Sequence, residues 1–139
     1  MYTVAFYETW ELIGKIALLD HSAVQDLAAR IDCSDYTEIE IIILSEAGSG
    51  NTIDIDVEEA DALTAGTLQG FGGGTDKDVT IADADFYTQI RLRSAEFSEG
   101  FRYLNVECTP SAARMFAVAI LGKPKSRPAS LTLVDNNVD

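Results

Sequence analysis

Residues 38 to 58 read EIEIIILSEAGSGNTIDIDVE, two apolar runs around a segment rich in glycine and serine. The first run alternates charged and apolar residues and then closes as an unbroken aliphatic stretch, which is typical of a strand entering a core. In the second run Ile53, Ile55 and Val57 alternate with carboxylates, so one face of the strand is apolar and the other acidic. The residues between them, 45 to 50, have the composition of a turn. Together these features predict two strands joined as a β-hairpin.

Further strand patterns follow at short intervals along the chain. Alternation or β-branched runs predict strands at residues 79–81, 88–93, 101–108 and 115–121. Turn signals separate them at 98–100 and 109–111, and the glycine-rich residues 59–78 predict a long surface loop. The pattern does not alternate strands with helices, as a parallel sheet would require, and it does not repeat. We therefore predict an all-β protein, a β-sandwich of the jelly-roll or immunoglobulin-like kind.

The first thirty residues fit no single pattern. Trp10, Ile13 and Ala17 would share one face of a helix, and Ser22 could cap a short helix through Arg30. The same stretch could instead be an extended arm that ends in a first strand near residues 29–32. We therefore predict three parts. They are an extended or partly helical N-terminal arm at 1–30, a jelly-roll-like β-sandwich at 31–122 and a C-terminal tail at 123–139.

The charge of the chain narrows the classes of partner. There are 23 acidic and 10 basic residues among 139, a net charge of -13. Such a surface repels phosphate backbones and anionic membranes, so we expect neither nucleic acid nor a membrane as partner. The longest apolar run, 115–121, is too short to cross a bilayer, and the first residues lack a signal-peptide pattern, so we expect a soluble protein made in a cytosol. Cys33 and Cys108 lie in apolar segments, and we expect free buried thiols, with a disulfide between them left open.

Three motifs resemble chemical sites, but each lacks a required part. Gly70 to Lys77 lacks the Gly-Lys-Ser/Thr order and the following helix of a phosphate-binding loop. Asp54 and Asp56 lie on a flat strand, where alternate carboxylates are about 6–7 Å apart and too far to share one calcium ion. His21, the one histidine, has no triad spacing and is predicted to be a surface or capping residue. We therefore predict no enzyme, no metal and no cofactor.

Both ends of the chain carry side chains suited to a partner. The N-terminal end has large aromatic residues without a place in the strand pattern, and the C-terminal end has basic residues on a proline-stiffened segment that could lie across an acidic neighbour. The predicted partner-binding residues are Tyr2, Phe6, Trp10, Lys123, Lys125 and Arg127. The other aromatic residues on or beside strand positions are predicted to lie in the core: Tyr87, Phe97, Phe101, Tyr103 and Phe116.

Three stretches resemble the capsid cement or head-decoration proteins of tailed bacteriophages, of the Bordetella-phage type. The acidic strand IDIDVEEAD at 53–61 is similar to a strand of those proteins that ends in an acidic or amide-rich stretch. Residues 90–92 followed by GFRYLNV at 100–106 are similar to their glycine, aromatic and Y-L/V-R-V strand. AVAILGKPKSRP at 117–128 looks like their closing strand, glycine, basic residue and proline.

This resemblance implies a jelly-roll protein without a cofactor, assembled in the host cytoplasm as a homotrimer. It would sit on the outer surface of an icosahedral head and bridge subunits of the major capsid protein. One alternative is a head–tail connector or a tail component. A second alternative, of another class, is a carbohydrate- or receptor-binding β-sandwich; it is weakened because Trp10, the only tryptophan, lies outside the strand region.

Overall fold

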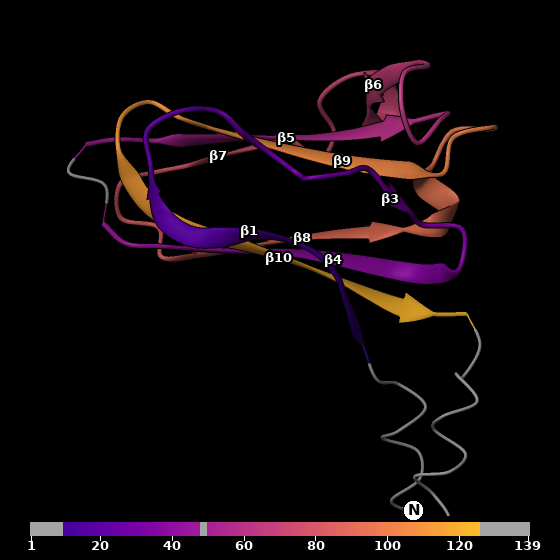
Figure 1. Cartoon of the computed structure of the whole chain (residues 1–139), viewed down its shortest axis with the longest axis horizontal. Helices are drawn as coiled ribbons and strands as arrows, with labels where there is room; N and C mark the ends of the chain where they lie inside the picture. Colours follow the sequence, from indigo (N-terminus) through magenta and orange to yellow (C-terminus); the bar gives the residue numbers. More distant parts are fainter. Residues whose placement is uncertain (1–9, 48–49, 126–139) are drawn as a thin grey trace, which may run out of the picture.

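The computed structural model describes residues 10–47 and 50–125, which fold into two antiparallel sheets facing each other (Figure 1). Sheet A has the strand order β1-β10-β4-β8. Its strands are β1 (Glu11–His21), β4 (Tyr36–Ser45), β8 (Tyr87–Arg93) and β10 (Arg114–Pro124). In sheet B the two long strands pair with each other, and shorter strands flank them on both sides. These strands are β2 (Gln25–Asp26), β3 (Ile31–Asp32), β5 (Ile53–Ala60), β6 (Leu68–Gly70), β7 (Val79–Ile81) and β9 (Tyr103–Pro110).

The path of the chain is that of a jelly roll. It crosses from one sheet to the other after β1, β3, β4, β7, β8 and β9. This wrapping brings the first long strand, β1, beside the last strand, β10, within sheet A. The predicted all-β fold is therefore correct, and of the two sandwich types the jelly roll is the one observed.

The predicted hairpin between residues 38–44 and 52–58 is wrong. β4 pairs with β10 and β8 in sheet A, whereas β5 pairs with β9, β6 and β7 in sheet B. The two strands carry the right alternation, but the turn between them crosses the sandwich instead of reversing within one sheet. Alternation reports which face of a strand is buried and does not report which strand lies beside it.

The core lies between β4 and β5 and their neighbours. The inward side chains are at most 1% exposed and come from both sheets: Ile39, Ile41, Ile43, Ile53, Ile55 and Val57. Burial of a side chain of this size stabilises a fold by roughly 1.5–3 kcal/mol. These two strands therefore supply a large part of the driving force for closing the sandwich.

Of the two alternatives left open for the first thirty residues, the helical one is wrong where the structure describes the chain, because residues 11–21 form β1 and β2 interrupts residues 22–30. β1 contains two bulges, one between Leu12 and Gly14 and one between Ile16 and Leu19. A bulge inserts an extra residue and breaks the period of two. Ile16 and Leu19, three residues apart, thus lie opposite β10 residues only two apart, and this spacing imitates a helix.

Several single-residue predictions can be compared with the structure. His21 is buried, with its ring 4.5 Å from that of Phe116, so its predicted surface position is wrong. Tyr87, predicted in the core, is 56% exposed because it points to the outer face of sheet A. Phe116 is in the core as predicted. Lys123 belongs to β10, since this strand continues to Pro124 instead of ending before the predicted tail.

The two cysteines are free and buried, and they cannot pair within one chain. The amide of Cys33 donates to the carbonyl of Arg102 at 2.8 Å, beside the start of β9. Cys108 lies in β9 itself, opposite Gln25 and Ile55. Because each strand residue advances about 3.3 Å, the two thiols lie far beyond the reach of a disulfide.

The helical elements among the described residues are two short 3-10 turns, η1 (Phe71–Gly73) and η2 (Ser94–Glu96). η1 lies in the predicted loop of residues 59–78, where Phe71 is buried with its ring centroid 5.0 Å from that of Phe97 in an edge-to-face arrangement. Within residues 10–47 and 50–125, no helix has the length or the apolar character to cross a membrane.

Candidate binding surface

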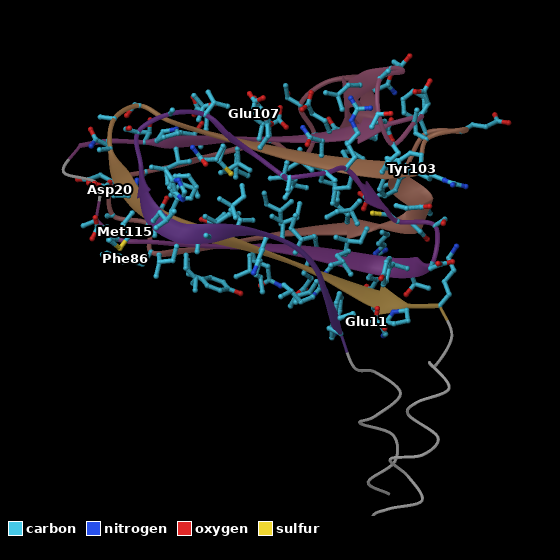
Figure 2. The ribbon with its side chains drawn as sticks, in the orientation of Figure 1. Glu11, Asp20, Phe86, Tyr103, Glu107 and Met115 are labelled. Atoms are coloured by element: carbon cyan, nitrogen blue, oxygen red, sulfur yellow. The ribbon has the colours of Figure 1, made fainter. Side chains whose placement is uncertain are left out.

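The outer face of sheet A has an apolar half. Four of its exposed side chains, which we call the apolar patch, are Leu44, Phe86, Tyr87 and Met115, with exposed fractions of 52%, 60%, 56% and 37%. Figure 2 shows Phe86 and Met115 near each other at one end of the sandwich, on the outer side of sheet A. Single exposed apolar residues are ordinary, but a contiguous group marks an interaction surface.

The register of the strands makes this group contiguous. Leu44 lies opposite Tyr87 on one side and opposite Ala117 on the other. Met115 is two residues before Ala117 and therefore shares its face, while Phe116 between them is buried. The patch thus covers three neighbouring strands, β8, β4 and β10.

A buried arginine fixes the backbone beneath the apolar patch. Arg114 is 1% exposed, and its guanidinium donates five hydrogen bonds of 2.9–3.3 Å. The acceptors are the carbonyls of Glu46, Asn51, Asp83 and Asp85 and the hydroxyl of Ser45. These groups lie at the end of β4 and in the segments that follow β4 and precede β8, next to Phe86. The aromatic side chains are therefore held on a constrained backbone.

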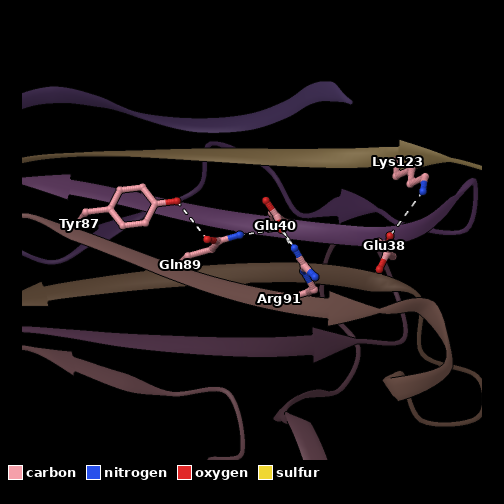
Figure 3. Close-up of polar contacts among 6 residues, drawn as sticks. All are labelled: Glu38, Glu40, Tyr87, Gln89, Arg91 and Lys123. Carbon is pink, nitrogen blue, oxygen red and sulfur yellow. Dashed lines mark hydrogen bonds and ion pairs between the residues drawn. The ribbon is translucent and has the colours of Figure 1, made fainter. Parts of the chain in front are cut away.

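The other half of the outer face carries a hydrogen-bonded row of polar groups (Figure 3). The Tyr87 hydroxyl donates to Oε1 of Gln89 at 3.1 Å, and Nε2 of Gln89 donates to Oε1 of Glu40 at 2.7 Å. Arg91 donates to the same Glu40 oxygen from Nε at 2.9 Å. Further along, Lys123 faces Glu38 with 3.8 Å between Nζ and Oε2. Charges here are paired within the chain, so this half offers oriented hydrogen-bonding groups more than net charge.

The outer face of sheet B is acidic and has a different character. Asp26 lies opposite Glu107, and Glu107 lies opposite Asp56 on the next strand. Burial raises the pKa of Glu107, and the charge of Asp26 raises it further. Burial likewise raises the pKa of Asp56, followed by the charges of Asp78 and Asp54. Like charges directly opposite one another destabilise a sheet, so this row opposes folding at neutral pH.

Nearby carboxylates on this face are already engaged by the protein. Oδ1 of Asp54 accepts the Thr80 hydroxyl at 2.7 Å, and Oδ1 of Asp78 accepts the amide of Val57 at 2.9 Å. In the part of the chain that the structure describes, no group of three or more His, Cys, Asp or Glu residues is placed to hold a metal ion.

The structure places only some of the predicted partner-binding residues. Tyr2, Phe6 and Arg127 lie outside the described residues. Trp10 is half-buried and directly precedes Glu11, which lies opposite Gly122, so it comes to the same end of sheet A as Lys123. Lys125 is exposed, and its amide donates to the carbonyl of Asp35 at 2.9 Å.

Sequence reasoning missed most of the apolar patch. A signal was present in the unbroken apolar runs at 41–44 and 115–121, because a strand that is apolar at consecutive positions is apolar on both faces. Phe86 and Tyr87 carried no such signal, since only the register of β8 against β4 turns Tyr87 outward beside Leu44.

No family model and no curated protein matches this chain. Among solved structures, TmCBM61 in complex with beta-1,4-galactotriose is 12% identical, covers 84% of this chain and 90% of its own, and has a TM-score of 0.42. Triatoma virus is 10% identical over 90% of this chain and 70% of its own, with a TM-score of 0.40. A pilus of Bacillus endospore appendages is 11% identical over 84% and 88%, with a TM-score of 0.39. Likenesses this distant do not identify what this chain binds.

Proposed function

We propose that this chain is a virion structural protein that cements an icosahedral phage head. In this proposal it sits on the outer surface of the capsid, binds the major capsid protein through the outer face of sheet A, and is assembled in the host cytoplasm. The observation that supports it most directly is the apolar patch, which spans three strands on a constrained backbone. The resemblance to cement proteins, which covers roughly residues 36 to 129, is the reason for naming the major capsid protein as the partner.

The arrangement of the sheets favours docking through a face over docking through an edge. β1, one edge strand of sheet A, is bulged twice, and β8, the other edge strand, has Lys77 and Glu96 bonded to backbone groups of its last residues. The edge strands of sheet B are only two or three residues long. Short and bulged edges discourage the addition of a further strand. A rigid apolar face, in contrast, can be buried without rearrangement and offers roughly 1.5–3 kcal/mol for each fully buried large side chain.

The docking surface can be tested with shells assembled from a tailed-phage major capsid protein that binds the wild-type chain. We expect Leu44→Asp and Phe86→Asp to abolish co-sedimentation with such shells, because each places a charge in the apolar contact. Leu63→Asp is the matched control, since Leu63 is 50% exposed and lies outside sheet A. Undiminished binding of both patch variants, or an equal loss in the control, would contradict the proposed docking surface.

The proposal includes the homotrimer that the resemblance implies. Light scattering of the isolated protein should then give three times the chain mass of 15.1 kDa. A monomer mass at micromolar concentration would contradict the homotrimer but would not bear on the docking surface.

Carbohydrate recognition is the second candidate function. It is favoured by the exposed rings of Phe86 and Tyr87 beside the Gln89–Glu40–Arg91 hydrogen bonds, because a sugar can stack on a ring while its hydroxyls bind oriented polar groups. A glycan array with wild type and Tyr87→Ala tests it. If the wild type binds a specific glycan, Tyr87→Ala loses this binding, and the wild type does not bind shells, sugar recognition is the function and cementing is not.

A further inference from the structure

One long edge of sheet A is left by β8, which pairs with β4 on one side and with no other strand in residues 10–47 and 50–125. The carbonyl of Phe86 accepts the amide of Ser45, so the backbone groups of residue 86 point toward β4. Backbone groups of successive residues point to opposite sides in an antiparallel strand. Those of Tyr87, Gln89, Arg91 and Arg93 therefore point toward the free edge.

Two side chains occupy the far half of this edge. Nζ of Lys77 donates to the carbonyl of Arg91 at 3.0 Å, and Oε2 of Glu96 accepts the amide of Arg93 at 2.7 Å. Lys77 and Glu96 also form an ion pair at 2.7 Å. They come from different segments, one before β7 and one in η2, and meet only at this edge. We call this pair the edge guard.

The two side chains of the edge guard are less exposed and have more hydrogen-bond partners than a typical ion pair on a protein surface. The side chains of Lys77 and Glu96 are 22% and 37% exposed, and they line a hollow together with Arg91, Arg93 and Ala95. Burial alone would raise the pKa of Glu96, but the hydrogen bonds from Lys77 and from the Arg93 amide outweigh it and lower that pKa. Both ends of the pair thus gain backbone contacts that a loose surface pair does not have.

We propose that the edge guard closes a strand-addition site, and that the strand it excludes is β8 of a second copy of this chain. An open strand edge is a template for pairing, and natural proteins block such edges with charged side chains. With Lys77 on the Arg91 carbonyl and Glu96 on the Arg93 amide, these groups cannot bond to another strand. The inference does not depend on the proposed cementing function.

The sequence of β8 explains why another β8 is the fitting partner. If two copies pair antiparallel about Gln89, Tyr87 of each copy lies opposite Arg91 of the other. This contact occurs twice and brings an aromatic ring to a guanidinium, which is attractive. Such a pairing is two-fold symmetric and would use the Arg91 carbonyl that Lys77 covers.

The test places a reporter at the centre of the excluded pairing. In Gln89→Cys, two copies paired through β8 would bring the new thiols to about 5.5 Å between Cα atoms, within reach of a short bis-maleimide. Cys33 and Cys108 are buried and should not react. The reporter is combined with Lys77→Ala/Glu96→Ala, which removes the edge guard. In the matched control it is combined with Asp32→Ala/Arg102→Ala, which removes a different ion pair. Lys77→Met/Glu96→Gln serves instead if the alanine pair does not fold by circular dichroism.

We expect about tenfold or more faster cross-linking to a dimer when the edge guard is removed, because backbone hydrogen bonds become available to the second copy. The reporter alone and the Asp32/Arg102 control should cross-link slowly. Equal cross-linking with and without the edge guard would overturn the inference. So would slow cross-linking of a folded guard-free variant, or fast cross-linking of the control.

Discussion

At the scale of single residues, Arg114 holds several backbone segments together through its side chain. It is a buried cation whose described hydrogen bonds go to four carbonyls and one hydroxyl. A guanidinium can satisfy several acceptors at once because its five donors have fixed directions, and lysine cannot reproduce this arrangement. The apolar patch therefore depends on one side chain that takes no part in it.

We expect Arg114→Met to lower the free energy of unfolding by about 3 kcal/mol or more, because several buried carbonyls lose their donor. Urea unfolding followed by circular dichroism measures this as a lower midpoint at an unchanged slope. Arg93→Met, at an exposed position, should change the stability by no more than about 0.5 kcal/mol. Similar midpoints for the two variants would show that the Arg114 hydrogen bonds do not stabilise the fold.

The two thiols give a second prediction at this scale. Burial raises the pKa of Cys33 to about 12 and the pKa of Cys108 to about 12. The pKa of a thiol in the unfolded chain is about 8.5, so above this pH the unfolded chain loses its thiol protons while the folded protein keeps them. The free energy of unfolding should therefore fall as pH rises from about 8.5 toward 12. At pH 8 we expect iodoacetamide to label neither cysteine of the folded protein and both in urea, as read by mass spectrometry. Rapid labelling of the folded protein would contradict the buried placement.

At the scale of the elements, the acidic row across β2, β9 and β5 makes stability depend on pH. The pKa of Glu107 is raised in the folded state, so the folded protein binds the proton more tightly than the unfolded chain does. Stability that is present at acid pH is then lost as pH rises through the raised pKa. Charge on the outer face of sheet B therefore works against folding at neutral pH.

We expect Glu107→Gln to stabilise the protein at pH 7 by about 0.2–1 kcal/mol, since it removes the central charge of three. The gain should vanish near pH 4, where the wild-type carboxyl is neutral, and should shrink in high salt. Thermal unfolding at the two pH values, with exposed Glu99→Gln as control, measures both effects. A gain that is the same at pH 4 and pH 7 would point to packing and not to charge.

At the scale of the whole molecule, the outer face of sheet A is partly apolar and the outer face of sheet B is acidic. The apolar patch and the internally paired polar groups lie on sheet A, whereas the carboxylates of Asp26, Glu107 and Asp56 lie opposite one another on sheet B. In the proposed cementing role, the molecule would dock through sheet A and leave its acidic face toward solvent. Such an acidic outer layer would also keep decorated particles apart in solution.

Salt separates the two predicted contributions to docking. Binding through the apolar patch should change little between low and high salt, because apolar contacts are not screened. Changing Lys123, Lys125 and Arg127 together to Ala should weaken binding at low salt and have less effect at high salt, since exposed charges are screened within about 8 Å at physiological ionic strength. Co-sedimentation across a salt series measures both. Wild-type binding by this triple variant at every salt concentration would show that the basic segment does not contribute.

The sequence alone was enough for the all-β class, for β4, β5, β7, β8, β9 and β10, and for the buried faces of β4 and β5. These properties are local, because the pleat of a strand sets a period of two that the order of apolar residues displays. It was not enough for β1, where two bulges broke that period and imitated a helix. The sequence also did not predict that His21 is buried, since burial at the end of an edge strand depends on which residues cover it.

The tertiary structure decided which strands lie side by side, and with them the candidate site. Leu44, Tyr87 and Met115 are separated by dozens of residues in the chain and become neighbours only through the registers of β8, β4 and β10. Lys77 and Glu96 meet in the same way at the free edge of β8. Pairing partners are chosen by burial and hydrogen bonding summed over the whole sandwich, and the alternation within one strand is the same whichever partner is chosen.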